Sequence, residues 1–256
     1  MNHLSGFFPD FGGSRLHYQY WEDSSRGYDK IAILLHGIGC HSGSYPELTA
    51  ALVAGRMKVF ALDFAGFGAS LGERGSGGAR AMADAVEVFL RRIESAEGSR
   101  DCAIVAHSMG AVASLLFLKR YPARKVRLVL VAPLLFGTPA IVLPGDLNEG
   151  EPTASKIAAD RLAAQDFPAA LRADIDSAAG DLLADPSFLA ERQVATLVGE
   201  SDPFVPVDAL RGAAGTWPVK RGGFVSYPRA RHDLVGGESG SLVISDILAW
   251  LGEGDG

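Results

Sequence analysis

Val105-Ala106-His107-Ser108-Met109-Gly110 is the stretch of this sequence from which the fold can be argued. An apolar run, Cys102 to Ala106, precedes the serine, and a helix-forming run, Met109 to Lys119, follows it. This order predicts a strand, a sharp turn and a helix, with the Ser108 hydroxyl standing clear of the backbone at the apex. The small residues at positions 106 and 110 allow so tight a turn to close. We therefore interpret Ser108 as a candidate nucleophile.

Strands and helices alternate on both sides of this turn. The apolar patterns predict strands over Arg15–Trp21, Ile31–Leu35, Lys58–Leu62, Cys102–Ala106, Val126–Val131, Val194–Val198 and Gly223–Tyr227. They predict helices over Pro46–Ala54, Ala79–Ile93, Met109–Tyr121, Val207–Ala214 and Leu242–Leu251. Such alternation indicates an α/β fold, with right-handed crossovers and a mostly parallel central sheet covered by helices on both faces. The N-terminal residues around His3 are expected to form a mobile tail.

The alternation stops at Pro133 and resumes near residue 193. The segment 133–192 contains short helical patches, many alanines and aspartates, and several prolines, and we predict no strand there. We therefore divide the chain into a core, residues 1–132 and 193–256, and a small helical cap, residues 133–192. Seven apolar cap residues could line a substrate pocket or form the cap's own core: Leu134, Leu135, Phe136, Ile141, Val142, Leu143 and Phe167. Three acidic cap residues are expected on a solvated helix face: Asp174, Asp176 and Asp181.

Composition and charge exclude several classes of protein. The chain has 256 residues, 48% of them apolar, and a net charge of −6 with acids and bases mixed along its length. This charge pattern argues against a nucleic-acid partner. We expect no integral membrane segment, because no apolar run approaches the roughly 20 residues needed to span a bilayer. Residues 1–13 lack the pattern of a secretory signal, so we expect a cytoplasmic protein. The oligomeric state stays open.

A base has to activate the serine, because a serine hydroxyl alone is a weak nucleophile at neutral pH. We predict His232, which lies in the loop between the last predicted strand and the last predicted helix. That loop is expected at the same edge of the sheet as the serine turn. The other histidines are His3, His17, His36, His41 and His107. His107 is adjacent to Ser108, but neighbouring side chains across a tight turn project in different directions, so it is a poor candidate.

The base in turn needs a carboxylate that fixes its tautomer and stabilises its charged form. The loop Gly199-Glu200-Ser201-Asp202-Pro203 follows a predicted strand and carries two acids. We predict Asp202, which lies deeper in the loop and precedes a proline that holds the chain extended or turned. Glu200 is its competitor. An acid at the end of the preceding strand is excluded, because Ala132 and Pro133 occupy that place.

Two backbone N–H groups are expected to form an oxyanion hole. The first is the N–H of Met109, at the N-terminus of the helix that follows the serine. The second is the N–H of Ile38, in the loop after the Ile31–Leu35 strand, where Gly37 lets the backbone turn toward the site.

Other polar features have structural interpretations. We expect His36 to shape its loop through hydrogen bonds, and Asp63 to order the glycine-rich loop that follows it. Cys40 and His41 are adjacent, but without a second pair of ligands they do not indicate a metal site. Neither Cys40 nor Cys102 suggests a disulfide framework. The glycines between residues 66 and 78 fit no nucleotide-binding spacing, so a wide structural loop is the better explanation.

Three loops resemble those of the α/β-hydrolase superfamily, and more narrowly its monoacylglycerol lipase and lysophospholipase-like branch. Residues 36–45, His-Gly-Ile-Gly-Cys-His-Ser-Gly-Ser-Tyr, are similar to the branch's His-Gly-x-Gly-Glu-His-Ser-x-x-Tyr loop. Residues 63–75 look like its Asp-x-Arg-Gly-His-Gly-x-Ser-x-Gly-x-Arg-Gly loop, and residues 106–110 resemble its Gly-His-Ser-Met-Gly elbow. The chain departs from these patterns at Cys40, Ala65, Phe67 and Ala106.

The resemblance covers essentially everything except the cap, and it implies the α/β-hydrolase fold. The order Ser108, Asp202, His232 is also the order of that architecture. We therefore expect an esterase that cleaves a hydrophobic, monoacylglycerol- or lysophospholipid-like acyl ester through an acyl-enzyme, with no cofactor and no metal. Thioester hydrolysis, acyl transfer and C–C bond cleavage by the same triad stay open. So does a non-catalytic binding protein that keeps the three residues.

Overall fold

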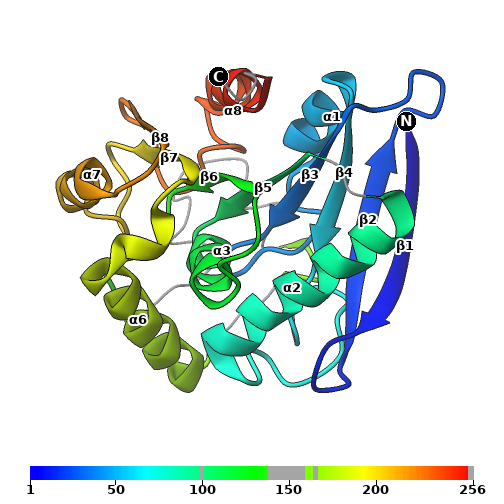
Figure 1. Cartoon of the computed structure of the whole chain (residues 1–256), viewed down its shortest axis with the longest axis horizontal. Coiled ribbons are helices and arrows are strands. Elements are labelled where there is room, and N and C mark those ends of the chain that lie inside the picture. The colour runs from blue at the N-terminus through cyan, green and yellow to red at the C-terminus, as the bar shows by residue number, and fades with distance from the viewer. Residues whose placement is uncertain (99–100, 138–158, 164–166, 253–256) are drawn as a thin grey trace.

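The computed structural model describes residues 1–98, 101–137, 159–163 and 167–252. Within these residues one sheet of eight strands runs through the molecule (Figure 1). The strands are β1 (Asn2–Pro9), β2 (Arg15–Glu22), β3 (Lys30–Leu35), β4 (Met57–Leu62), β5 (Cys102–His107), β6 (Arg127–Val131), β7 (Gln193–Gly199) and β8 (Arg221–Tyr227). Their order across the sheet is β1-β2-β4-β3-β5-β6-β7-β8.

The sheet is mostly parallel, as predicted. Strands β4, β3, β5, β6, β7 and β8 pair in parallel, whereas β1 pairs with β2, and β2 with β4, in antiparallel fashion. The carboxyl ends of the parallel strands therefore meet at one edge. The loops that carry the candidate site residues all leave from this edge.

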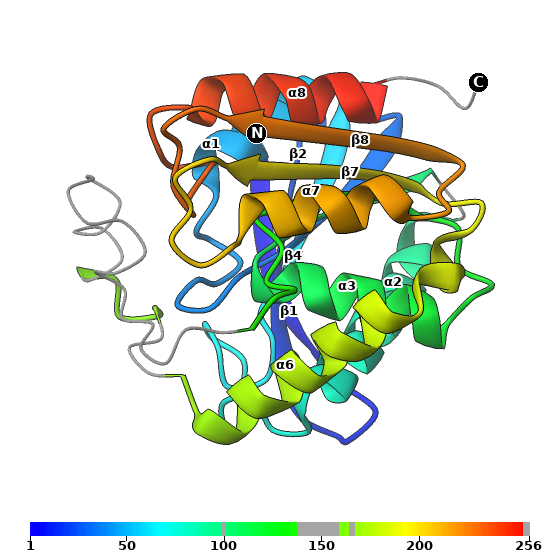
Figure 2. The ribbon, with the colours of Figure 1, turned by 90° about the vertical axis from the view of Figure 1, so that its left-hand side faces the viewer.

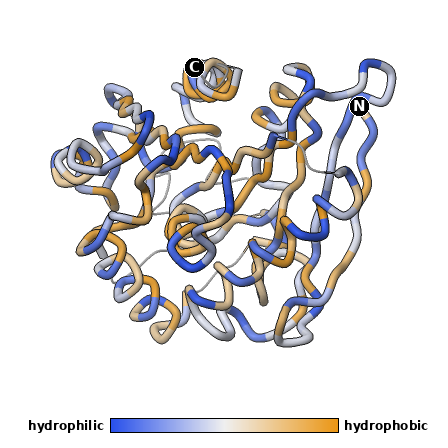
Figure 3. The backbone as a smooth tube through the Cα atoms, in the orientation of Figure 1, coloured by the Kyte–Doolittle hydropathy of each residue, from blue (hydrophilic) through white to orange (hydrophobic). Residues whose placement is uncertain are grey.

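Helices cover both faces of the sheet (Figure 2). Helices α1 (Pro46–Ala54) and α8 (Gly240–Gly252) lie on one face, and α2 (Gly78–Glu97), α3 (Met109–Arg120) and α7 (Val207–Thr216) lie on the other. The inner strands β3 to β7 are buried along almost their whole length because both of their faces are covered. Figure 3 shows the hydrophobic stretches along these central strands. This double burial explains their continuous apolar sequences.

The N-terminal residues form strand β1, so the prediction of a mobile tail was wrong. β1 pairs with β2 over its whole length, from Asn2 opposite Glu22 to Pro9 opposite Arg15. The His3 ring stacks on Trp21 with centroids 4.9 Å apart. Most β1 side chains are exposed. An edge strand of this kind carries little of the apolar alternation that identifies a half-buried strand.

Helix α6 (Ala169–Ala184) is the longest described element between Pro133 and Arg192. It packs on α2 and α3 through a buried stripe at helical spacing: Leu171, Ile175, Ala179 and Leu182. A short 3₁₀ helix, Pro186–Leu189, follows, and Ala190 forms an isolated bridge with Val219. The division into core and cap stays a prediction. Ile141, Val142 and Leu143 lie outside the described residues.

Asp174 on α6 is exposed, as expected for a solvated helix face, and it also has a structural role. Its carboxylate accepts a hydrogen bond from the N–H of Ala79, at 2.5 Å, in the first turn of α2. A carboxylate is favourable there because the first N–H groups of a helix have no partners within it. Asp174 therefore caps the N-terminus of α2 and links α6 to that helix.

Candidate active site

Ser108 occupies the sharp turn between β5 and α3. Its φ of 54° and ψ of −114° are unusual for a residue with a side chain. A hydrogen bond from its N–H to the carbonyl of Val131, at 2.9 Å, ties the turn to the next strand. A Cβ atom at Gly110 would lie 2.6 Å from the carbonyl oxygen of Leu35, so this position requires glycine. The turn thus has the strained geometry predicted for a nucleophile.

The structure brings Ser108, His232 and Asp202 together. The Nε2 atom of His232 lies 2.9 Å from Ser108 Oγ, and its Nδ1 atom lies 2.8 Å from Asp202 Oδ2. The three residues come from the loops after β5, β7 and β8, all at the carboxyl edge of the sheet. The side chains of His232 and Asp202 are buried, with exposed fractions of 3% and 0%.

Asp202 is held in place by its own loop. Its Oδ1 atom accepts hydrogen bonds from the N–H groups of Phe204, at 2.8 Å, and Val205, at 3.1 Å. These bonds orient the carboxylate so that Oδ2 faces the imidazole. The neighbouring acid, Glu200, instead accepts a hydrogen bond from the Ser226 hydroxyl on an exposed surface. The geometry therefore favours Asp202 over Glu200 as the partner of the histidine.

This arrangement fixes the proton positions on His232. A carboxylate can only accept, so Nδ1 carries the hydrogen and donates it to Asp202. The Nε2 lone pair then faces the Ser108 hydroxyl and can accept its proton. The loops after β7 and β8, which carry Asp202 and His232, can approach closely because Gly199 has no side chain. A Cβ atom at Gly199 would lie 2.2 Å from the carbonyl oxygen of Ala230.

The loop after β3 lies against the serine turn. A Cβ atom at Gly37 would be 2.9 Å from Ser108 Cβ, so the absence of a side chain lets the loop reach the nucleophile. Ile38 follows in this loop and is buried, and Met109 is the buried first residue of α3. The N–H groups of Ile38 and Met109 remain our proposed oxyanion donors.

Two of the remaining histidines order loops around the site. His36 donates from Nδ1 to the carbonyl of Gly37, at 2.8 Å, and accepts at Nε2 from the N–H of Phe64, at 3.1 Å. Its complete burial lowers the pKa of His36, so the ring stays neutral in this structural role. His41 accepts at Nδ1 from the N–H of Gly43 and donates from Nε2 to Asp160, at 2.7 Å. No sequence pattern indicated the contact between His41 and Asp160.

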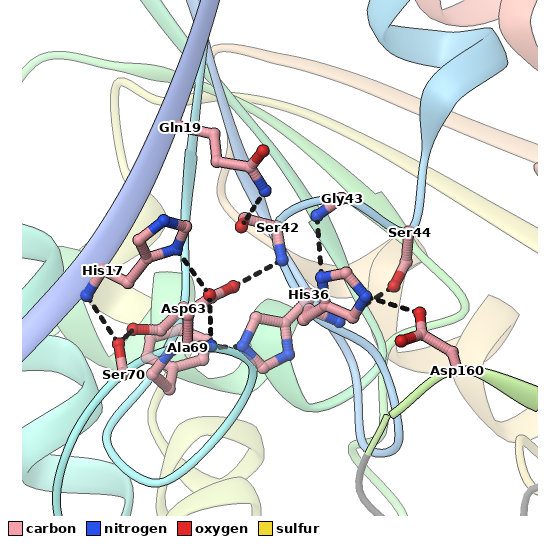
Figure 4. Close-up of polar contacts among 12 residues, drawn as sticks. His17, Gln19, His36, Ser42, Gly43, Ser44, Asp63, Ala69, Ser70 and Asp160 are labelled. Atoms are coloured by element: carbon pink, nitrogen blue, oxygen red, sulfur yellow. Dashed lines mark hydrogen bonds and ion pairs between the residues drawn. The ribbon is translucent and has the colours of Figure 1, made fainter. Parts of the chain in front are cut away.

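Asp63 organises the loops next to the site through a dense set of hydrogen bonds (Figure 4). Its carboxylate accepts from His17 Nδ1 at 2.8 Å, from the N–H of Ser42 at 2.5 Å and from the N–H of Ala69 at 3.0 Å. Burial alone would raise the pKa of Asp63, but these hydrogen bonds outweigh burial and lower the pKa to about 2. The expectation that Asp63 orders the following loop is confirmed.

The glycine-rich loop is structural, as expected, because several of its glycines have positive φ or no room for a side chain. A Cβ atom at Gly68, whose φ is +54°, would lie 2.3 Å from Asp63 Oδ2. One at Gly78 would lie 2.1 Å from Asp174 Oδ2. The loop is thus packed tightly around two carboxylates.

Replacing Asp63 with asparagine is expected to destabilise the fold by about 2 kcal/mol at pH 7. The folded-state pKa lies below the ordinary value of 3.8, so the carboxylate stabilises the protein above about pH 4. That contribution is lost as the pH falls toward 2. Urea unfolding should therefore show a difference in the free energy of unfolding between wild type and Asp63→Asn that is smaller at pH 3 than at pH 7.

The control is Asp29→Asn, at an exposed carboxylate paired with Arg56. This variant should change the free energy of unfolding by less than about 0.5 kcal/mol. If Asp63→Asn differed from wild type by the same free energy of unfolding at pH 7 and at pH 3, the lowered pKa assigned to Asp63 would be contradicted.

The two cysteines are buried and free. Burial raises the pKa of both Cys40 and Cys102 to about 12, so neither thiol is a reactive thiolate at neutral pH. Within the described ranges no group of three or more histidine, cysteine or acidic side chains could hold a metal ion. In the same part of the chain, no helix is both long and apolar enough to cross a membrane.

Residues 27–165 match the protein family described as serine aminopeptidase, S33. The chain belongs to this family. It is an α/β-hydrolase of the monoglyceride lipase-like branch, and the resemblance drawn from its loop motifs is confirmed.

Individual proteins are also similar to this S33 family member. It is 26% identical to the monoacylglycerol lipase of Mycolicibacterium smegmatis over 95% of each chain. It is 31% identical to the human monoglyceride lipase, over 50% of this chain and 42% of the human protein. The crystal structure of Paleococcus ferrophilus monoacylglycerol lipase superposes with a TM-score of 0.81, at 20% identity, covering 92% of this chain and 98% of that one. At this identity the superposition supports the fold.

Proposed function

We propose that this chain is a serine hydrolase that cleaves a carboxylic ester through an acyl-enzyme, with Ser108, His232 and Asp202 as its catalytic residues. The observation that carries the proposal is the continuous hydrogen-bonded line from Ser108 Oγ through the His232 ring to Asp202, with separations of 2.9 and 2.8 Å. Membership of the S33 family and the ester-cleaving relatives support the same reaction class.

The reaction begins with attack of Ser108 Oγ on the ester carbonyl carbon while His232 Nε2 takes the hydroxyl proton. The oxyanion that forms is held by the N–H groups of Ile38 and Met109. His232 then gives its proton to the leaving alcohol, and the acyl group remains on Ser108. In the second half His232 takes a proton from water, which attacks the carbonyl carbon of the acyl-enzyme. The bond between the acyl group and Ser108 Oγ then breaks, His232 returns the proton to Ser108 Oγ, and the acid leaves. Asp202 stabilises the imidazolium in both halves.

A hydrophobic acyl group suits the surroundings of the nucleophile. The segment after β6 contacts the serine turn, where the N–H of Leu134 donates to the Ser108 carbonyl at 3.4 Å. Leu134 and Leu135 are both buried, with exposed fractions of 2%. Several relatives are monoacylglycerol lipases by name, so we propose a small-molecule acyl ester of the monoacylglycerol or lysophospholipid type as substrate. A cytoplasmic location is a further proposal, which cell fractionation tests.

Labelling with a fluorophosphonate probe tests the proposed nucleophile directly. The probe phosphonylates a serine only when a base activates it. We expect one adduct, on the tryptic peptide that contains Ser108, detected by mass spectrometry, and loss of labelling after denaturation. A panel of p-nitrophenyl esters of increasing chain length then reports the acyl preference, which we expect to favour medium or longer chains over acetate. An unlabelled Ser108 in folded protein would refute the proposal.

A further inference from the structure

His107 lies at the centre of a buried hydrogen-bonded chain that joins the loop after β3 to the backbone of His232. The N–H of Gly37 lies 3.2 Å from the Tyr45 hydroxyl, and that hydroxyl lies 3.1 Å from His107 Nδ1. On the other side of the ring, His107 Nε2 lies 3.3 Å from the carbonyl oxygen of His232. The side chains of Tyr45 and His107 are both buried.

The direction of each bond in this chain follows from the groups at its ends. The His232 carbonyl can only accept, so His107 Nε2 carries a hydrogen and donates it. In the neutral ring Nδ1 is then an acceptor, and the Tyr45 hydroxyl donates to it. The hydroxyl oxygen in turn accepts from the N–H of Gly37, which can only donate. Neutral His107 therefore satisfies every member of the chain.

A charged His107 would oppose the reaction that the site is proposed to perform. Its ring centroid lies 5.1 Å from that of His232, which becomes an imidazolium when it takes the serine proton. Burial, and then the charge on His232, lower the pKa of His107 to about 4. The other ionisable groups that face His107 or Tyr45 are Asp202 and Asp233, from the loops after β7 and β8, and Cys40, from the loop after β3. The Tyr45 hydroxyl adds to the preference for the neutral ring by donating to Nδ1.

We propose that Tyr45 and His107 are positioning residues of this active site. Together they fix the spacing between the loop that carries the proposed oxyanion donor Ile38 and the backbone of the base His232. Tyr45 also adds to the effect of burial, which keeps the ring beside His232 uncharged during turnover. This inference rests on the proposed function and assigns a role to two residues outside the triad and the oxyanion hole.

The test is the kinetics of Tyr45→Phe on a soluble p-nitrophenyl ester, with active sites counted by fluorophosphonate titration. We expect kcat per active site to fall about tenfold, with KM within about twofold, because one hydrogen bond that orients the site is lost. Without the hydroxyl, His107 takes up a proton at higher pH. Protonation of His232 gives the acid limb a slope of about 1 in a plot of log kcat/KM against pH, and protonation of His107 raises the slope to about 2. The pH below which this second ionisation appears should be about 0.5–1 unit higher in Tyr45→Phe than in wild type.

Two further variants separate positioning from general destabilisation. Tyr227→Phe removes another buried tyrosine hydroxyl, which donates to Asp246 at 2.8 Å, and it should leave the pH profile unchanged. In Tyr45→Phe/His107→Gln the residue beside His232 cannot titrate, so the second ionisation should be absent. A second ionisation that persists in the double variant, or a Tyr45→Phe variant that behaves like Tyr227→Phe, would overturn the inference. A wild-type protein without esterase activity would instead refute the proposed function.

Discussion

Ser108→Ala is expected to lower kcat/KM for p-nitrophenyl acyl esters by about 10⁵-fold or more. The alanine variant lacks the oxygen that would form the acyl-enzyme, and His232, 2.9 Å from that oxygen, has nothing to deprotonate except water. Binding of the ester should change little, because the remaining contacts are kept. Stopped assays at high enzyme concentration, with fluorophosphonate labelling in parallel, measure the loss.

The control for this substitution is Ser114→Ala in α3, the helix that follows Ser108. Ser114 is fully buried, and its hydroxyl donates to the Ala111 carbonyl at 2.8 Å, so the change is the same in chemistry and in burial. Ser114→Ala should keep activity within about threefold. Circular dichroism and thermal unfolding should show that both variants fold. Retained turnover in folded Ser108→Ala would refute the assignment of the nucleophile.

Asp202→Asn is expected to reduce kcat by about 10⁴-fold while leaving the fold largely intact. An asparagine amide at this position would donate to His232 Nδ1, which then becomes the acceptor. The hydrogen would move to Nε2 and point at Ser108, so the ring could no longer take the serine proton. Imidazolium formation would also lose its carboxylate partner. Steady-state kinetics between pH 6 and pH 9 measure the effect.

Glu200→Gln is the matched control, because Glu200 is the other acid in the same loop. Its carboxylate bonds to the Ser226 hydroxyl on the exposed surface, away from His232. This variant should keep kcat within about twofold. If Glu200→Gln were the inactive variant and Asp202→Asn the active one, the acid would have to be reassigned.

Most of the fold could be predicted from sequence because the parallel strands are buried on both faces. The apolar runs Ile31–Leu35 and Val194–Val198 lie within β3 and β7. The last residue of each run lies within about one residue of the last residue of its strand. The parallel order then places the three loops with the serine, acid and histidine at one edge. Chain order and strand ends alone were sufficient to bring these loops together.

The features that the sequence did not reveal depend on contacts between distant segments. β1 is stabilised by pairing with β2, although its own side chains are mostly exposed. Asp174 caps α2 across 95 residues of sequence, and His41 bonds to Asp160 across 119. In the same way His107 looked like a flank of the serine, whereas its ring bonds to Tyr45 and to the His232 backbone. Residue type and local spacing carry no information about such partners.

The order of strands also has a consequence for the protein during its synthesis. Ser108 follows β5, a strand at the middle of the sheet. Asp202 and His232 follow β7 and β8, and of these strands β7 pairs with β6 and β8 pairs with β7. A nascent chain that has left the ribosome up to β6 can already form the serine turn, yet it carries neither the acid nor the base. Catalytic competence is therefore acquired late in translation. Ester turnover by ribosome-bound chains of increasing length would report the completion of the sheet.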